Sequence, residues 1–554
     1  MVRLKKLQRR PLLRKRRQAD PIISSSGSPK GRRWFALTPL NCLACVCLFL
    51  NVLVLSLTLM INRRLKQKGN VVPNQTPPPE RISSSVATVA AAKGDFKISS
   101  SHGASNYLVP PAKVKESPTP LHIVFHTDCR DPTQDWQAYV LFYGIYKMKQ
   151  PGEVTRVISG CQQEGRKMSL ETTHKTQIEP MGVLASGSAS RFHVHFAPAH
   201  PHQAEIGSLR KHMKYFNRPF GIYHWMEHVL GYSEQKPNNA HDGTVIIVMD
   251  CDMIVMRPLT ADFGMEELWK KQLNPQLQGQ PQRVQPGHPM AQHTAFPSQW
   301  WNELEVGTVS SPAIQPGLTK LQQMLRSDVD NHYATGLPIL AAASDFYPLV
   351  QKWSAVAFPL FEALQEKILR EPHGPYALAA AELQKPHQLA ESFSIQGHKE
   401  PGFGLLEAHF SGYEGAALLS RPDAQCRQTP VELKPHILQY SKRYGLGNFI
   451  IGKHYMPKNF MGTMDACDQP LYAEPPDNIA ELFRYYMDPE LKQRVEIEKE
   501  MHILQMSVML CEIIQAFNEA ATNWKQRHCT QARVNIDKQL QFEDGEPPKS
   551  RRER

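Results

Sequence analysis

Two carboxylates one residue apart are the side chains of this chain best placed to do chemistry. Asp250 and Asp252 follow an apolar run at 245–249, which predicts a strand buried on both faces in a mainly parallel sheet. Ligands of such sheets bind outside the carboxyl ends of the strands. Exposed carboxylates there can hold a hard divalent cation, which can bridge to a diphosphate. Short acidic tripeptides are more often solvated turns, so this interpretation depends on the rest of the chain.

The charge of the chain argues against a nucleic-acid partner. The formal net charge of +12 is concentrated in a basic tail at 1–33 and in a second basic tail at 530–554. Basic ends are typical of disordered tails rather than of a nucleic-acid groove. The middle of the chain has neither zinc-ligand Cys and His spacing nor an RNA-recognition signature.

One uncharged stretch predicts a membrane anchor. Residues 34–61 are mostly apolar and long enough to cross a bilayer, which needs roughly 20 residues. A secretory signal peptide is the alternative, but its apolar region is shorter, about 7–15 residues. The excess of basic residues before the stretch favours an amino terminus in the cytoplasm and a luminal body. This predicts a type II single-pass protein of the Golgi (or endoplasmic reticulum) membrane.

A stem and a large α/β body follow the predicted span. Residues 62–118 are rich in Pro and Ser, lack apolar periodicity and predict a disordered stem with a sequon at Asn74. Residues 119–487 predict the main domain, and 488–529 a terminal helix packed on it. Type II receptors share this layout, so it does not by itself indicate an enzyme.

The body is expected to begin with a strand, a helix and a strand at 121–127, 134–149 and 154–158. Cys129 and Cys161 each follow one of these strands. Their sulfurs are therefore expected to meet at one sheet edge and, in an oxidising lumen, to form a disulfide. Seven cysteines follow the span, so at least one is left over, and we expect Cys251 to be the free thiol.

The next helix supplies a candidate contact for the diphosphate. After a strand at 192–196, a helix is expected to begin at Asn217, with Pro219 in its first turn, and to end near Tyr232. Arg218 at the start of this helix is a candidate donor contact, or else a solvated surface arginine.

Two later segments have less regular patterns. Residues 264–330 predict a long loop beside the site, in which Trp300 and Trp301 either stack on a sugar or peptide or anchor the loop. Residues 360–383 predict a helix broken by Pro372 and Pro375.

Several motifs, taken in order, resemble the plant and algal peptidyl-serine α-galactosyltransferases and the related hydroxyproline O-arabinosyltransferases. The resemblance covers most of 121–529 and is patchy between 260 and 330. Its motifs are Asp135-Trp-Gln, Lys149-Gln-Pro-Gly, Thr155-Arg, Asn217-Arg-Pro, Tyr223-His-Trp, Val248-Met-Asp-Cys-Asp-Met-Ile, Thr335-Gly-Leu-Pro-Ile-Leu, Gly404-Leu-Leu-Glu-Ala, Gly445-Leu-Gly-Asn-Phe and Glu474-Pro-Pro, with Cys511 and Cys529.

This resemblance implies a GT-A fold and a membrane-anchored luminal enzyme. It implies transfer of galactose or arabinose, with retention, from a UDP-sugar donor to hydroxyls of a Ser- or hydroxyproline-rich acceptor protein. It also implies a Mn²⁺ (or Mg²⁺) cofactor held by Asp250 and Asp252, which count with Glu407, on the acceptor side, as the candidate catalytic residues.

One position departs from the family pattern. Family members read His-Tyr near the site, where this chain reads Gln439-Tyr440, and a late histidine often completes the metal shell of GT-A enzymes. His454 is a candidate replacement ligand, or else a surface histidine; His436 has the opposite strand parity from Gln439, which counts against it. The departure also favours an alternative function, a non-catalytic type II membrane protein that uses the fold as a binding or scaffold module.

Overall fold

A computed structural model gives the fold of the body of the chain. It describes residues 119–183, 189–204, 213–234, 239–264, 282–294, 311–364, 374–395, 404–413, 416–446, 449–453, 466–468, 471–486, 497–530 and 539–540. The predicted amino-terminal tail, membrane span, stem and sequon lie outside these residues. Within them, no helix combines the length and the apolar composition needed to cross a membrane.

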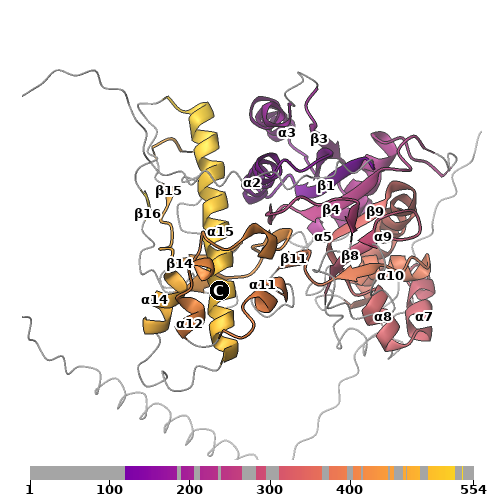
Figure 1. The fold of residues 1–554 in the computed structure, drawn as a ribbon. Helices are drawn as coiled ribbons and strands as arrows, with labels where there is room; N and C mark the ends of the chain where they lie inside the picture. The colour runs from indigo at the N-terminus through magenta and orange to yellow at the C-terminus, as the bar shows by residue number, and fades with distance from the viewer. Residues whose placement is uncertain are drawn as a thin grey trace, which may run out of the picture. The chain divides into compact units, whose positions relative to one another are not determined.

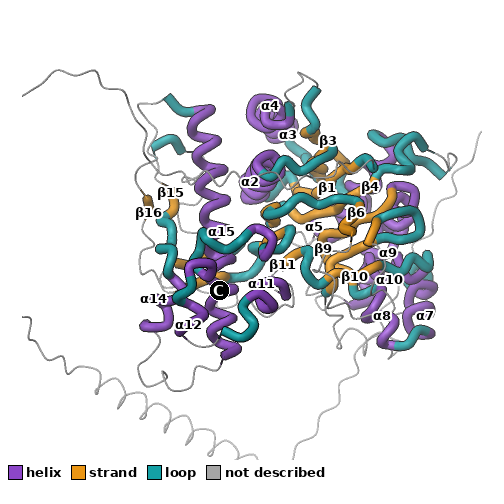
Figure 2. Tube along the Cα trace, viewed as in Figure 1, coloured by secondary structure: helices purple, strands orange, loops and turns teal. Residues whose placement is uncertain are grey.

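A seven-stranded sheet forms the centre of the described body (Figures 1 and 2). Its strand order is β10-β8-β9-β4-β1-β2-β3. Pairing is parallel from β4 to β3 and between β8 and β10, whereas β9 is antiparallel to both of its neighbours. The expected mainly parallel α/β sheet is therefore confirmed. Its strands are β1 (Leu121–Asp128), β2 (Glu153–Ser159), β3 (Phe192–Ala197), β4 (Val245–Asp250), β8 (Met290–His293), β9 (Thr335–Ala342) and β10 (Gln388–Ala390).

The order of these strands changes direction next to β1. The chain moves from β1 outward to β2 and β3 and then returns to place β4 on the other side of β1. Ligands of open α/β sheets bind at such a switch, outside the carboxyl ends of the strands. Asp250 ends β4 and lies opposite His126 of β1, two residues before Asp128 ends that strand. The topology thus brings Asp128 and Asp250 to the sheet edge at which ligands bind.

Helix α5 (Met213–His228) packs on β1, β2 and β3 and against α9 (Ala343–Leu364). The close approach depends on Gly221, because a Cβ there would lie 2.6 Å from Ser159 Oγ and 3.1 Å from Val157 Cγ1. Helix α2 (Thr133–Lys147) packs on β1 and on β5 (Met253–Val255). These contacts fix the two helices that flank the switch point.

The carboxyl-terminal helix α15 (Ile497–His528) lies against α2, as Figure 1 shows. Tyr139 donates a hydrogen bond to Asn523 Oδ1 at 2.9 Å, and the rings of Trp136 and Trp524 meet edge to face. The helix expected at 488–529 is found as α15 over Ile497–His528, and 488–496 lie outside the described residues.

A second, three-stranded sheet continues from the end of the metal-motif strand. Its order is β11-β12-β5, and β12 (Ile437–Gln439) runs antiparallel to β5. The other elements are α3 (Glu164–Thr173), a π-helix (His174–Ile178), α4 (Glu179–Gly182), β6 (Asp262–Gly264), β7 (Gln282–Arg283), α7 (Gln315–Gln323), α8 (Arg326–His332), α10 (Gly374–Glu382), β11 (Ser394–Ile395), α11 (Gly404–His409), α12 (Ala416–Leu419), β13 (Tyr444–Leu446), β14 (Phe449–Ile451), β15 (Leu471–Tyr472), α14 (Ile479–Tyr486), β16 (Gln539–Leu540) and short 3₁₀ turns at Pro201–Ala204, Pro422–Ala424 and Val431–Leu433.

Three expected elements differ from the structure. Helix α5 begins at Met213 rather than at Asn217, so Pro219 lies inside it; proline lacks an N–H, but here the neighbouring packing keeps the helix intact. It also ends at His228, before Tyr232. The segment 264–330 is no simple loop, because it contributes β8 to the main sheet and both α7 and α8. The broken helix expected at 360–383 corresponds to the end of α9, which already begins at Ala343, and to α10; residues 365–373 lie outside the described ones. Trp300 and Trp301 lie outside the described residues.

Three disulfides tie the described chain together. Cys129 is bonded to Cys161, as expected from the two strand ends. The other pairs are Cys426 with Cys511 and Cys467 with Cys529, which attach α15 to the body. Cys251 is a buried free thiol, as expected.

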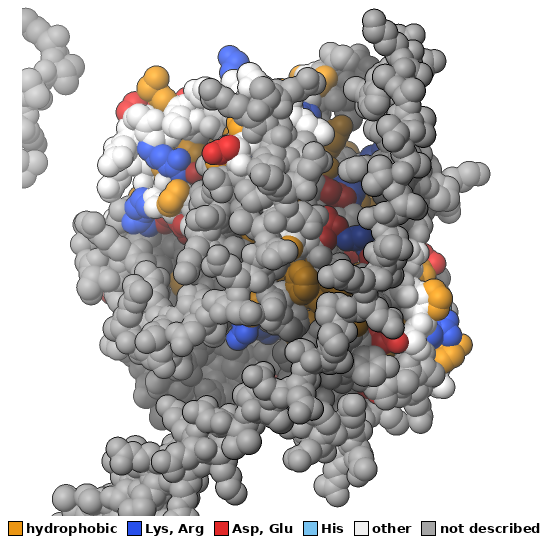
Figure 3. Space-filling view, turned by 90° about the vertical axis from the view of Figure 1, so that its left-hand side faces the viewer, with side chains coloured by type: hydrophobic (Ala, Val, Ile, Leu, Met, Phe, Trp, Pro, Cys, Tyr) orange, Lys and Arg blue, Asp and Glu red, His pale blue; other side chains and the backbone are white. Residues whose placement is uncertain are grey.

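On the face drawn in Figure 3, acidic and basic side chains of the described residues are interspersed.

Replacing both Cys129 and Cys161 by Ser should lower the free energy of unfolding. The disulfide closes a loop across 32 positions. Without it the unfolded chain gains conformational entropy, which stabilises the unfolded state by about 3–4 kcal/mol. Urea unfolding of the double variant and the wild type measures the difference. Peptide mapping without reductant that found both thiols free in the wild type would contradict the pairing.

Candidate active site

Asp250 is held at the end of β4 by a cation from the facing helix. Arg218 of α5 forms an ion pair with the Asp250 carboxylate, and both side chains are only 15% exposed. Arg218 lies inside α5 rather than at the start of a helix, so its guanidinium charge, and not the helix end, acts on Asp250. The candidate donor contact and the first metal-motif aspartate are therefore neighbours.

Asp252 is held by a second cation and by an amide. Lys453 Nζ lies 2.6 Å from Asp252 Oδ2, and Gln439 Nε2 donates to Asp252 Oδ1 at 3.1 Å. The Asp252 side chain is 2% exposed and that of Lys453 19%. We expected an exposed carboxylate at this position. That expectation is wrong because the turn between β4 and β5 is covered by β12 and by the segment that carries Lys453.

Backbone hydrogen bonds place these side chains in one layer. The Tyr440 N–H donates to Asp252 O at 3.1 Å, and the Lys453 N–H donates to Tyr440 O at 2.7 Å. Tyr444 adds a side-chain bond from its hydroxyl to Gln439 O at 2.6 Å. Gly452 lets the chain reach the position of Lys453, because a Cβ on Gly452 would lie only 2.2 Å from Lys442 O. Gln439 therefore does reach the site, as its place in the sequence motif predicts.

The electrostatics of the pair favour the charged form of both partners. Burial by itself raises the pKa of Asp252, but the Lys453 ammonium, the Gln439 hydrogen bond and the Arg218 charge hold that pKa below its usual value. Burial by itself lowers the pKa of Lys453, but Asp252 and its neighbours outweigh burial and raise it. The site thus contains an aspartate and a lysine that are charged at neutral pH.

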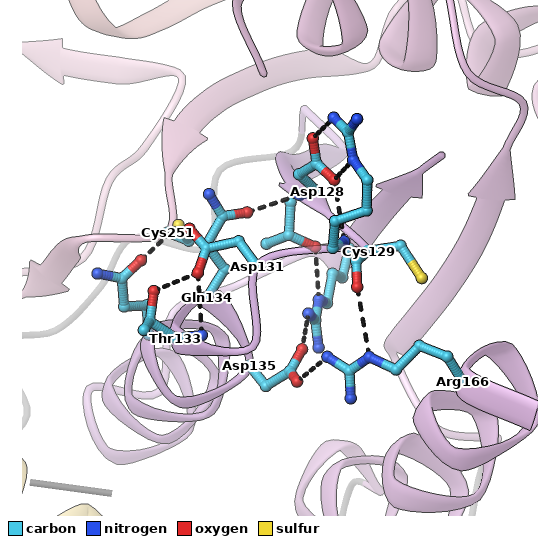
Figure 4. Close-up of polar contacts among 12 residues, drawn as sticks. Asp128, Cys129, Asp131, Thr133, Gln134, Asp135, Arg166 and Cys251 are labelled. Carbon is cyan, nitrogen blue, oxygen red and sulfur yellow. Dashed lines mark hydrogen bonds and ion pairs between the residues drawn. The ribbon is translucent and has the colours of Figure 1, made fainter. Parts of the chain in front are cut away.

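The loop after β1 borders the site and is stiffened by its own side chains (Figure 4). Asp128 accepts bonds from Arg130, and its N–H donates to Gln134 Oε1 at 2.6 Å. Asp131 accepts from the N–H of Thr133, the first residue of α2, at 3.1 Å. These bonds hold the loop in one shape at the edge of the sheet.

A second ionic network lies below this loop (Figure 4). Asp135 of α2 pairs with Arg156 of β2 at 2.6 Å and also with Arg166 of α3. Arg166 Nε in turn donates to Cys129 O at 3.3 Å. The Asp135-Trp136-Gln137 and Thr155-Arg156 motifs of the sequence thus meet in space, and one of their functions is to fasten α2 and α3 to the sheet edge.

Two buried residues near the acidic pair remain uncharged. Burial, followed by the Arg218 charge, lowers the pKa of His126 to about 3 against the opposing effect of Asp128. Burial raises the pKa of the Cys251 thiol to about 12, and its Sγ donates to Gln137 Oε1 at 3.2 Å. Cys251 therefore points into packing against α2, as expected.

The predicted Mn²⁺ (or Mg²⁺) would have to be held by Asp250 and Asp252. Each carboxylate already has a cationic partner, and Gln439 turns an N–H donor toward Asp252 rather than an oxygen. Among the described residues, no group of three or more His, Cys, Asp or Glu side chains is arranged to hold a metal ion. As these side chains lie, they do not fit a divalent cation.

The remaining candidates lie apart from this pair or cannot be placed. Glu407 of α11 accepts a hydrogen bond from Gln505 Nε2 of α15 at 2.9 Å, so the carboxyl-terminal helix positions it. His436 contacts Pro258 O through Nδ1 and packs between the rings of Phe263 and Phe393. His454, the third predicted metal ligand, lies outside the described residues.

Lys453 is the site residue that the sequence motifs did not single out. It is separated from Asp252 by 201 positions, and only the antiparallel pairing of β12 with β5 brings the two segments together. The one available signal was Gly452, because a glycine, which lacks a Cβ, can mark a close approach of the backbone.

Comparison with known proteins gives one match in sequence. Over 143 residues the chain is 25% identical to the peptidyl serine alpha-galactosyltransferase of Arabidopsis thaliana. The match covers 26% of this chain and spans 14% of the length of that relative. It supports the resemblance to glycosyltransferases that the motifs indicate. No protein-family model matches the chain.

Comparison with solved structures returns further glycosyltransferases. The galactosyltransferase LgtC, in complex with donor and acceptor sugar analogs, is 12% identical with a TM-score of 0.27, covering 59% of this chain and 89% of that one. The glycosyltransferase GlyE of Streptococcus pneumoniae TIGR4 is 12% identical with a TM-score of 0.29, covering 60% and 58%. With TM-scores this low, neither likeness by itself establishes a shared fold.

Replacing Lys453 by Met should destabilise the protein at neutral pH, because it leaves the buried Asp252 without its cation. Breaking such a pair costs about 3–5 kcal/mol. Adding Asp252→Asn should recover part of the loss, since the amide carries no charge. Urea unfolding of the two single variants and the double variant measures the coupling.

The pKa shifts of Asp252 and Lys453 predict how the stability difference between wild type and Lys453→Met changes with pH. Because the folded-state pKa of Asp252 is lowered, the stability it contributes is present above its unfolded value of about 3.9 and is lost as the pH falls through the folded value. Because the pKa of Lys453 is raised, its contribution persists below about 10.4 and is lost at higher pH. The difference between wild type and Lys453→Met should therefore shrink on acidification. A difference that stays constant as the pH falls from 4 to 2 would contradict the assigned charges.

Proposed function

We propose that this protein is a glycosyltransferase that moves galactose or arabinose from a UDP-sugar to Ser or hydroxyproline hydroxyls of a secretory-pathway protein. The observation that carries the proposal is the cluster of Asp250, Asp252, Arg218 and Lys453 at the carboxyl end of β4, beside the switch in strand order. Few ligands other than a multiply charged anion would use two cations so placed. The sequence match to a peptidyl serine alpha-galactosyltransferase supports the choice of a sugar nucleotide.

The donor diphosphate would lie against Arg218 and Lys453. Charge-assisted hydrogen bonds from guanidinium and ammonium groups to phosphate are stronger than neutral ones, and Arg matches phosphate geometry with two parallel bonds. The stiff loop after β1, from Asp128 to Gln134, would then border the nucleoside end of the donor. Each of these groups is already fixed by the fold, so the site is organised before the donor binds.

The transfer needs one bond broken and one formed. The bond from the sugar C1 to the phosphate oxygen breaks, and its electron pair stays on the diphosphate. The acceptor hydroxyl oxygen forms a bond to C1 on the same face, which retains the anomeric configuration, and its proton passes to the departing diphosphate oxygen. Fixed cations stabilise the charge that develops on the leaving group. The protein needs no strong base, because the departing diphosphate oxygen takes the acceptor's proton.

The acceptor side of the proposal rests on Glu407. Its carboxylate is held by Gln505 of α15, which gives it a fixed orientation. A positioned carboxylate can accept a hydrogen bond from an acceptor hydroxyl or peptide N–H. The membrane anchor at 34–61 and the Golgi (or endoplasmic reticulum) location remain part of this proposal.

A non-catalytic binding module is the second candidate. It is favoured by Gln439, because its amide N–H, and not a metal-binding imidazole, faces Asp252. Such a module would bind UDP but transfer no sugar. Product analysis separates the two functions, since binding alone leaves the UDP-sugar intact.

Incubating the purified protein with UDP-galactose, UDP-arabinose and Ser- or hydroxyproline-rich peptides should yield one glycosylated peptide, detected by mass spectrometry. Asp252→Asn should lower the rate at least about 100-fold, because it removes a charge that organises the diphosphate site. Since Asp252 is buried and paired with Lys453, this variant should also lose thermal stability.

Glu153→Gln is the matched control. Glu153 carries an exposed carboxylate at the opposite, amino-terminal end of β2, paired with His193 at 2.7 Å. It should keep wild-type activity. Equal activity of Asp252→Asn and wild type would remove Asp252 from the site, and UDP binding without any transfer would favour the second candidate.

A further inference from the structure

The charges at the proposed donor site balance without a metal ion. Two carboxylates, Asp250 and Asp252, face two cations, Arg218 and Lys453, and all four side chains are less than one-fifth exposed. A divalent cation would have to take the carboxylate oxygens that these cations occupy. It would then leave a guanidinium and an ammonium beside a doubly charged ion in a poorly hydrated site, where like charges repel strongly.

Both cations keep donors for a further anion. Arg218 Nε is buried and has no hydrogen-bond partner among the residues that the structure describes. Lys453 carries three N–H donors, of which the bond to Asp252 uses one. An anion at this place can bond to the remaining Lys453 donors, because that side chain is 19% exposed, whereas Arg218 Nε is buried and would be reached only after a shift of its neighbours.

The position of Lys453 is built into the backbone. Its N–H is bonded to Tyr440 O, and Gly452 lets the chain pass within contact of Lys442 O. The Asp252 carboxylate then accepts a hydrogen bond from the Lys453 ammonium. The carboxylate is nearly inaccessible to solvent, so its evident role in this structure is to orient and retain the lysine.

We propose that the donor diphosphate is neutralised in this protein by Arg218 and Lys453 instead of by a divalent cation, with Asp250 and Asp252 as the residues that position them. This inference rests on the proposed function, since it concerns how the same site holds the sugar nucleotide. Glutamine at position 439 is consistent with it, because an amide N–H stabilises a carboxylate that has no metal to bind.

The test measures binding of UDP and of inorganic pyrophosphate to the purified full chain by calorimetry, once with EDTA and once with Mn²⁺. UDP should bind in EDTA with a dissociation constant within about threefold of the value in Mn²⁺. A loss of about 30-fold or more in EDTA, restored by Mn²⁺, would overturn the inference while leaving the proposed function standing. If neither probe binds in either buffer, the proposed function itself fails, and the inference fails with it.

Variants of Lys453 identify the group responsible. Lys453→Gln should weaken UDP binding in EDTA by about tenfold or more, the effect of losing a charge-assisted bond, whereas Lys453→Arg should stay within about threefold. The control is Lys434→Gln, which breaks a similarly buried ion pair with Glu512 (2.5 Å, side chains 11% and 9% exposed) away from β4. It should bind UDP as the wild type does. Equal weakening by both glutamine variants would show a general loss of stability and overturn the role of Lys453.

A direct metal measurement supplies a readout independent of the nucleotide. Electron paramagnetic resonance of Mn²⁺ should show no more ion bound to the wild type than to Asp252→Asn. Combining Lys453→Gln with Gln439→His removes the competing cation and adds an imidazole ligand, so this double variant should gain a Mn²⁺ site. Tight Mn²⁺ binding by the wild type that Asp252→Asn abolishes would contradict the proposal.

Discussion

A buried carboxylate must have a cation close by, and in this protein the pairing of Asp252 with Lys453 meets that need. The pair joins the turn after β4 to a segment 201 positions later, and it does so under cover of β12. Placing two charges out of water is costly unless their geometry is good and their other hydrogen bonds are made. The Gln439 amide and the backbone bonds through Tyr440 supply those further contacts. The site therefore exists only when both sheets are in register.

The main sheet explains why this pair lies at the edge where ligands of open α/β sheets bind. Strand β4 returns to the side of β1 opposite to β2, so the carboxyl ends of β1 and β4 open next to each other. Helix α5 can bring Arg218 to Asp250 because Gly221 lets it approach β2. The close packing of α5 on the sheet therefore places the Arg218 cation where it neutralises the Asp250 carboxylate.

Local sequence patterns predicted the parts of the fold that rest on local interactions. The strands expected at 121–127, 154–158, 192–196 and 245–249 are found as β1, β2, β3 and β4 nearly to the residue, because continuous or alternating apolar residues leave few alternatives to a strand. The pairing of Cys129 with Cys161 followed from the ends of two adjacent strands. Strand β8 was missed, since it is four residues long with two polar side chains and is a strand only because β9 and β10 flank it.

The candidate site was predicted in part for the same reason. Asp250 and Asp252 stand out because they follow an apolar strand, and Arg218 because it precedes Pro219. Their partners could not be assigned, since an ion pair across two sheets leaves no periodic signal in either segment. The burial of Asp252 was missed as well, because a strand end looks exposed until the covering strand is known. Lys453 is recognisable only after the antiparallel register of β12 with β5 is fixed.

Gln439 is the residue at which two ways of holding a diphosphate diverge. An amide can present its N–H to a carboxylate or its oxygen to a cation, and here the N–H faces Asp252 while Oε1 is buried with no partner among the described residues. Turned over, Oε1 would lie against the Asp252 oxygen, and two acceptors would face each other with nothing between them. An imidazole at this position would instead offer a lone pair and would favour a metal. The amide, together with Lys453, makes the carboxylate stable without one.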